Sequence, residues 1–234
     1  MKSDQAEVQS AIELVARTLG KPLGPGELGA LMARAGVGKT ACLTHIALEH
    51  LFKNQPVLHV SVDGTAEKIK IWYQELIKDL FGTASREECT AQYHRIESLR
   101  FILAYLHQTF SVQKLEKSLQ DLQEQTDFHP ALIVLDGLDF DQGPRATATE
   151  LKSFAQAHGL PLWMSIRTHR HIAVTNEHGI PYPCHETDEL FDAILLLEPS
   201  PSALQVRILK HGGLYRPDHP DIFLNPQTCL MLKG

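Results

Sequence analysis

The segment ARAGVGKTA, residues 33–41, constrains the fold of this chain more than any other part of its sequence. It lies between the apolar run LGALMA (28–33), typical of a short buried strand, and the helix-like run KTACLTHIALEHLF (39–52). Its first eight residues match the pattern A/G-x-x-x-x-G-K-S/T, whose glycines let the backbone curl its N–H groups around a phosphate. The sequence therefore predicts a strand, a phosphate-binding loop and a helix in succession.

The residues of this loop have expected roles. Lys39 is expected to reach the β- and γ-phosphates of a nucleotide, and the Thr40 hydroxyl to ligate Mg²⁺. The predicted nucleotide-binding residues are Ala33, Arg34, Ala35, Gly36, Val37, Gly38, Lys39, Thr40 and Ala41. The alternative is a glycine turn that does no more than begin a helix.

A second anchor for Mg²⁺ is predicted at the end of another strand. The run ALIVLD (131–136) is continuously apolar, which suits a strand covered on both faces, and it ends in Asp136. An acidic residue at this point is the expected Walker B partner of a phosphate-binding loop. Asp139 is a less favoured substitute.

Strand-like and helix-like patterns alternate along the first two thirds of the chain, which predicts an α/β fold: a mainly parallel sheet, helices on both faces, and antiparallel strands at the C-terminal end. We expect one domain, 1–234, with an N-terminal helix and turn at 1–22 and a helical segment at 84–127. The predicted strands are 28–33, 56–62, 131–136, 161–166, 193–198, 203–210 and 221–232. The predicted helices are 8–19, 39–52, 65–81, 91–110, 111–125 and 146–159.

Composition narrows the class of protein. The chain has 234 residues, 43% of them hydrophobic, and a formal net charge of −6, which argues against a broad surface for nucleic acid. It has no apolar run long enough to span a membrane and no secretory signal at its start. Its four cysteines, Cys42, Cys89, Cys184 and Cys229, lack CxxC spacing. We therefore expect a soluble, cytoplasmic protein without disulfide bonds.

Four segments in this order resemble a known family: GPGELGALMARAGVGKT, PVLHVSVDGTAEKI, SVQKLEKSLQDLQEQTDFHPALIVLDGLDF and HGLPLWMSI. They are similar to the RecA-type ATPase core in its DnaB-helicase and KaiC-like branch, from about residue 23 to the C-terminus. The resemblance implies a three-layer P-loop NTPase core that uses ATP and Mg²⁺, and it suggests a homo-oligomer.

The resemblance also implies catalytic roles. Asp63 occupies the position of the family's glutamate that polarises the attacking water; alternatively, Asp63 only caps the following helix. Lys210 matches a lysine that reaches the neighbouring subunit's nucleotide, but Gly212 stands where the family has an arginine. Arg216 could replace that arginine only if the chain folds back. These differences predict slow turnover, or activation by a protein partner that supplies an arginine.

The residues after the strand 161–166 raise further hypotheses. Ser165 is similar in place to a residue that senses the γ-phosphate, although Ile166 replaces a common glutamine. The stretch 167–189 carries Arg167, Arg170 and several histidines that could touch DNA, but its acidic residues make nucleic-acid contact the less favoured interpretation. Its histidine and cysteine spacing does not match zinc sites, so a solvated, mobile loop is expected.

Three functions remain open at this point. The first is a RecA/KaiC-like ATPase that acts as a switch or motor. The second is a dimeric ATPase similar to ParA and MinD, with Arg34 at the position of that family's signature lysine. The third is a nucleotide-binding module with little hydrolysis, since the residues at 63, 166 and 212 depart from the catalytic pattern while the phosphate loop is intact.

Overall fold

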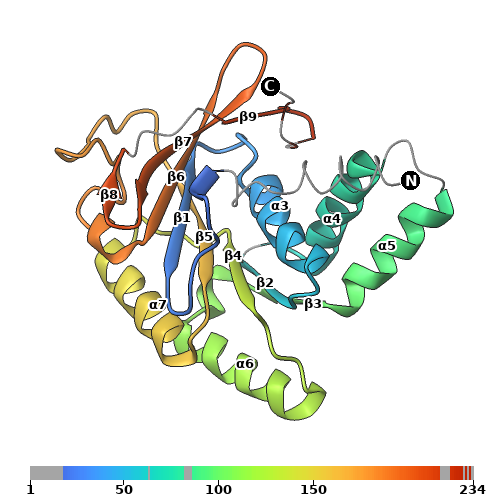
Figure 1. Ribbon diagram of the computed structural model, residues 1–234. Helices are drawn as coiled ribbons and strands as arrows, with labels where there is room; N and C mark the ends of the chain where they lie inside the picture. Colours follow the sequence, from blue (N-terminus) through green and yellow to red (C-terminus); the bar gives the residue numbers. More distant parts are fainter. Residues whose placement is uncertain are drawn as a thin grey trace.

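A nine-stranded sheet runs through the computed structural model, which describes residues 18–62, 64–81, 86–216, 222–228, 230 and 232 (Figure 1). The strand order is β3-β2-β4-β5-β1-β6-β7-β8, and β9 pairs with β7. The strands are β1 (Leu28–Ala33), β2 (Val57–Val62), β3 (Arg100–Tyr105), β4 (Leu132–Asp136), β5 (Leu162–Arg167), β6 (Ala193–Pro199), β7 (Leu204–His211), β8 (Leu214–Tyr215) and β9 (Ile222–Leu224). The helices are α3 (Lys39–Phe52), α4 (Ala66–Leu80), α5 (Arg86–Ser98), α6 (Val112–Thr126), α7 (Pro144–His158) and two 3₁₀ turns, η1 (His107–Thr109) and η2 (Asp188–Leu190).

The strand directions confirm the predicted α/β fold. Every pair among β1 to β6 is parallel, whereas β7 pairs antiparallel with β6, β8 and β9. Helices α3, α4 and α5 cover one face, and α6 and α7 cover the other (Figure 1). Parallel strands need such crossover helices, so their buried residues form continuous apolar runs.

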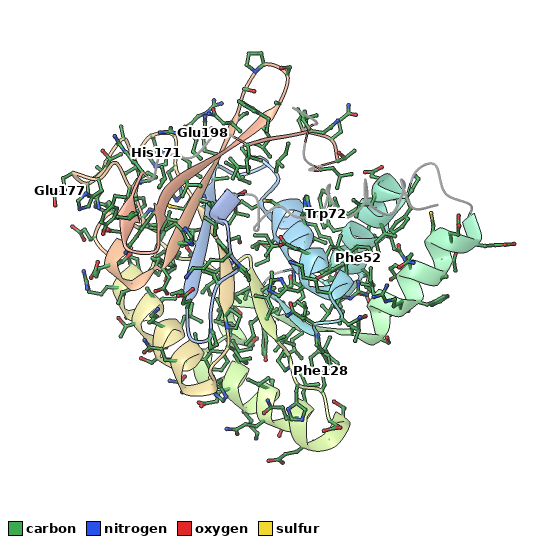
Figure 2. All side chains as sticks on the ribbon, in the orientation of Figure 1. Phe52, Trp72, Phe128, His171, Glu177 and Glu198 are labelled. Carbon is green, nitrogen blue, oxygen red and sulfur yellow. The ribbon has the colours of Figure 1, made fainter. Side chains whose placement is uncertain are left out.

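Side chains alternate between the two faces and build two cores. In β1, Leu28 and Met32 pack with α6 and α7, while Leu31 packs with α3 and α4. Figure 2 shows Phe52 and Trp72 on the α3 and α4 side of the sheet, and Phe128 on the α6 side, between α6 and the strands. The sheet is therefore buried on both faces, as the three-layer expectation requires.

The predicted helix over 91–110 is wrong in its second half. Residues 86–98 form α5, but Arg100–Tyr105 is strand β3, which pairs with β2 along its whole length. β3 is the edge strand, and most of its residues are only half-buried. Because its apolar residues neither form a fully buried run nor alternate cleanly, the pattern did not distinguish a strand from a continued helix.

The irregular stretch after β5 fits the expected solvated loop only in its first half: residues 168–179 are exposed or half-buried, whereas residues further along pack into the core. Residues 168–192, here called the β5–β6 connection, link two parallel strands that lie on either side of β1. No described helix of more than one turn lies within it, yet Ile180, Cys184 and Phe191 are buried in the same core as α6 and α7. It closes one face of the sheet in place of a crossover helix.

Several other predictions agree with the structure. Helix α4 begins at Thr65, whose side chain accepts a hydrogen bond from the Lys68 amide, and α6 begins at Ser111 in the same way. The helix predicted at 8–19 lies almost entirely outside the described residues, as does Cys229. Among the described residues, Cys42, Cys89 and Cys184 form no disulfide bond. Among the described helices, none is both long and apolar enough to cross a membrane.

Candidate functional site

The loop between β1 and α3 has the backbone shape that a phosphate cradle needs. Gly36 and Gly38 have positive φ angles of 77° and 102°, a conformation that side chains disfavour. Gly38 ends the turn and begins α3, where its carbonyl accepts from the Cys42 amide at 2.9 Å. The first backbone N–H groups of this 14-residue helix therefore face the loop. No side chain caps them.

Lys39 lies folded over this loop. Its Nζ donates to the carbonyl oxygens of Ala33 and Arg34, at 3.1 Å each. Burial lowers the pKa of Lys39, the Asp136 carboxylate opposes this, and the Arg167 guanidinium lowers the pKa further. The ammonium group is therefore partly desolvated and held where an anion would be attracted.

A hydrogen-bonded trio joins three secondary-structure elements beside Lys39. Thr40 Oγ1 on α3 donates to Asp136 Oδ2 at 2.6 Å, and Ser165 Oγ on β5 donates to Asp136 Oδ1 at 2.6 Å. The Gly137 amide donates to Ser165 Oγ at 3.1 Å. The buried Asp136 carboxylate thus contacts a hydroxyl with each oxygen.

Strand order explains this meeting of distant residues. Strand β5 lies between β1, which leads into the loop, and β4, which ends in Asp136. Because all three strands are parallel, their carboxyl ends lie at the same edge of the sheet. The end of β5 therefore lies between the loop and Asp136.

A cavity of about 590 Å³ opens over this edge of the sheet. Its polar lining includes Lys39, Thr40, Asp136, Ser165 and Arg167. It extends across the ends of β4 and β2 toward Lys68 and His107. A volume of this size is within the range of small-ligand sites.

These residues fit MgATP. The Gly36 position opens onto empty space, as a backbone cradle requires, because an added Cβ would meet nothing within 4 Å. Thr40 and Asp136 supply a hydroxyl and a carboxylate oxygen side by side, the hard oxygen ligands that Mg²⁺ prefers. Lys39 and Arg167 supply positive charge for phosphate oxygens.

A comparison with protein families supports the same interpretation. A family model described as AAA domain matches residues 4–163, more than half of the chain. The chain belongs to this family of P-loop ATPases. No curated protein matches the sequence. The matched part of this AAA-domain ATPase includes the loop and Asp136 but ends before Ser165 and Arg167. Members of the family generally use ATP and Mg²⁺.

Asp63, the predicted water-polarising residue, lies outside the described residues, so its role stays a prediction. Its neighbours Val62 and Gly64 both line the cavity. The other acidic residues of the lining have partners already: Asp139 Oδ1 accepts from the Asp141 amide at 3.1 Å, and Asp141 pairs with His169 at 2.7 Å. Asp139 thus organises its own loop, whereas Asp136 makes the contact with Thr40.

Lys210 is not part of this cavity lining. It is buried, its Nζ donates to the Asp188 carbonyl at 2.7 Å, and it lies 5.2 Å from the centre of the Tyr215 ring. Lys210 therefore has partners in its own subunit, and its action on a neighbour's nucleotide stays a prediction. Arg216 does fold back after the β7–β8 turn, but its guanidinium lies against Gly179.

Three basic residues of the cavity lining were not predicted as nucleotide-site residues. Arg167 was expected at the start of a stretch for which DNA contact was the less favoured interpretation, but it is the last residue of β5. Lys68 lies in the first turn of α4, and His107 lies in η1, after the strand that the sequence did not reveal. A signal existed only for Arg167, since a polar residue that ends a strand next to the loop strand faces the same edge.

Proposed function

We propose that this chain is an ATPase domain that binds MgATP and hydrolyses it as a RecA/KaiC-like switch or motor. The observation that carries the proposal is the 2.6 Å contact between Thr40 and Asp136 beside Lys39, within one cavity. A loop that served only to begin a helix would not require a buried carboxylate on its first hydroxyl. Support also comes from the AAA-domain family match.

The chain's own groups would divide the work of hydrolysis. The loop amides and Lys39 would hold the phosphates and stabilise charge on the γ-phosphate as a water attacks in line. Thr40 and Asp136 would hold Mg²⁺, which supplies further positive charge when bound. Asp63 is our proposed orienting group for the water.

A nucleotide-binding module with little turnover is the second candidate. One observation favours it: each acidic side chain of the described cavity lining already has a hydrogen-bonding or ionic partner. Asp141 Oδ1 is buried without a hydrogen-bond partner, but Asp141 is already paired with His169 through its other oxygen. The described lining therefore offers no carboxylate side chain that is wholly free to act as a base for water. Nucleotide affinity would be the same under both candidates, so only turnover separates them.

Phosphate release from MgATP by the purified protein, with and without single-stranded DNA, tests the proposal. Lys39→Ala is the informative variant, and Lys117→Ala, an exposed lysine on α6, is the matched control. We expect turnover that Lys39→Ala abolishes and Lys117→Ala leaves intact. Nucleotide binding without turnover would favour the second candidate, and binding unaffected by Lys39→Ala would reject both.

A further inference from the structure

We infer that Arg167 binds the terminal phosphate of the nucleotide from within the same chain, in place of an arginine supplied by a neighbour. The inference rests on the proposed function, because it adds a residue to the same site. The family that the sequence resembles has an arginine where this chain has Gly212. Arg167 would supply that missing positive charge.

The backbone of Arg167 is fixed against the phosphate loop. Arg167 is the last residue of β5 and pairs with Ala33, the last residue of β1 before the loop. The next amide, that of Thr168, donates to the Ala33 carbonyl at 2.9 Å, and Lys39 donates to the same oxygen. The Arg167 side chain therefore extends from a strand end that is held rigidly next to the loop.

Strand alternation directs the side chain toward the site. Trp163 packs into the core on the α3 face, and Ser165, two residues later, donates to Asp136. Arg167 is two residues further and has the same parity, so its side chain lies on the same face. It is exposed, and it lines the cavity together with Lys39 and Thr40.

The charges around Arg167 favour the binding of an anion. In the part of the chain that the structure describes, no hydrogen bond or ion pair holds its guanidinium, and each oxygen of nearby Asp136 already accepts a hydroxyl. Arg167 also contributes, after burial, to lowering the pKa of Lys39. Two like charges on rigid elements repel each other, and a phosphate between them would relieve that cost.

Lys210, Arg216 and Arg170 do not line the cavity. Lys210 is buried against Asp188, and Arg216 lies against Gly179. Arg170 is exposed but lies three residues beyond the end of β5 and outside the cavity lining. Arg167 is thus the arginine that the described lining offers to a phosphate on the Asp136 side of the loop.

The first experiment compares ADP with a non-hydrolysable ATP analogue, both with Mg²⁺, by calorimetry. The variants are Arg167→Gln, with Arg167→Lys as the conservative change and Arg170→Gln as the matched control. We expect Arg167→Gln to weaken the analogue at least tenfold and ADP less than threefold, because only the analogue carries the third phosphate. Thermal unfolding checks that each variant is folded.

The second experiment mixes Arg167→Gln with Lys39→Ala and measures phosphate release. An arginine acting between subunits would restore turnover, because the Lys39→Ala chain still carries Arg167; an arginine acting within its own chain would not. Restored turnover would overturn the inference, as would an unchanged ratio of analogue to ADP affinity in Arg167→Gln. Absence of Lys39-dependent nucleotide binding in the unmodified protein would instead reject the proposed function, and this inference with it.

Discussion

Ser165, two residues before the end of β5, donates a 2.6 Å hydrogen bond to Asp136, the last residue of β4, and so fixes one oxygen of the carboxylate. The other oxygen is then left to Thr40. This arrangement orients Asp136 before any nucleotide arrives, and preorganised groups lose less free energy on binding. The orientation of the proposed Mg²⁺ anchor therefore depends on β5.

Replacing Ser165 by alanine tests this dependence. The change removes the donor to Asp136 and the acceptor of the Gly137 amide, so we expect the free energy of unfolding to fall by about 1–2 kcal/mol. Turnover should fall by roughly tenfold, since Asp136 gains rotational freedom. Chemical denaturation and phosphate release measure the two effects. Ser153→Ala, an exposed position on α7, should change neither.

Thr40 should control the effect of magnesium. Thr40→Ala removes the hydroxyl beside Asp136, whereas Thr40→Ser keeps it. In the unmodified protein Mg²⁺ should strengthen ATP binding, and in Thr40→Ala we expect most of that gain, at least tenfold, to disappear. Titration of ATP in Mg²⁺ and in EDTA measures this gain. A full magnesium effect in the alanine variant would contradict the assignment.

The buried pair His59 and Tyr73 predicts an acid-sensitive fold. His59 Nδ1 lies 3.0 Å from the Tyr73 hydroxyl, and burial lowers the pKa of His59 to about 4, with Arg100 lowering and Asp136 raising it. The unfolded chain would titrate near 6.5. Between these values the unfolded state binds more protons, so the free energy of unfolding falls as pH falls from 6.5 to 4 and gains nothing above 6.5.

The expected loss from His59 is about 2 kcal/mol at pH 5. Urea denaturation of the unmodified protein and of His59→Gln, at pH 7 and at pH 5, isolates it, because only the former carries the titrating ring. The two proteins should converge in stability at the lower pH. His129→Gln, at a largely exposed site, should follow the unmodified protein at both values. A pH slope shared by all three would refute the prediction.

Asn176 should decide whether the β5–β6 connection stays folded. Its side-chain amide donates to the His185 carbonyl at 3.0 Å and to Asp188 Oδ1 at 2.9 Å, and its Oδ1 accepts from the amides of His178 and Ile180. Asn176→Ala leaves these groups unpaired, so we expect a loss of about 2–4 kcal/mol in the free energy of unfolding.

Hydrogen exchange followed by mass spectrometry locates the effect of Asn176→Ala. Exchange should rise across residues 168–192 before it rises in β1 or β4. Gln125→Ala, at an exposed site on α6, serves as the control and should show no change. Faster exchange over the whole sheet, without an earlier rise in the connection, would show that Asn176 is not a local support.

The sequence predicted best those strands whose hydrophobic pattern matches their burial in the fold. Strands β1 and β4 were predicted to within a residue because both faces of these strands are covered, so every position before Asp136 is apolar or glycine. Strand β3 was missed because an edge strand carries half-exposed side chains. The phosphate-binding loop and the acidic residue at the end of β4 were predicted to act together, although they are far apart in the sequence. The structure brings Thr40 and Asp136 into contact.

The surroundings of Arg167 and Lys210 could not be predicted in the same way. Both depend on which strands are neighbours, and strand order is a tertiary property. Lys210 is the last residue of the predicted strand 203–210, yet it is buried and contacts Asp188, 22 residues away. Arg167 resembled the start of a loop, but pairing with Ala33 extends β5 through it.

The helix-free route from β5 to β6 has a consequence for how this chain can change through evolution or design. Helix α7 is held in shape by hydrogen bonds of its own backbone, whatever its exposed side chains are. The β5–β6 connection is instead held by individual groups, among them Asn176, Asp188 and Arg145, which bonds to the Glu186 carbonyl and to Glu189. Insertions and sequence drift should therefore be less tolerated there than its loop-like composition suggests, and grafting a new binding loop onto this scaffold should begin elsewhere.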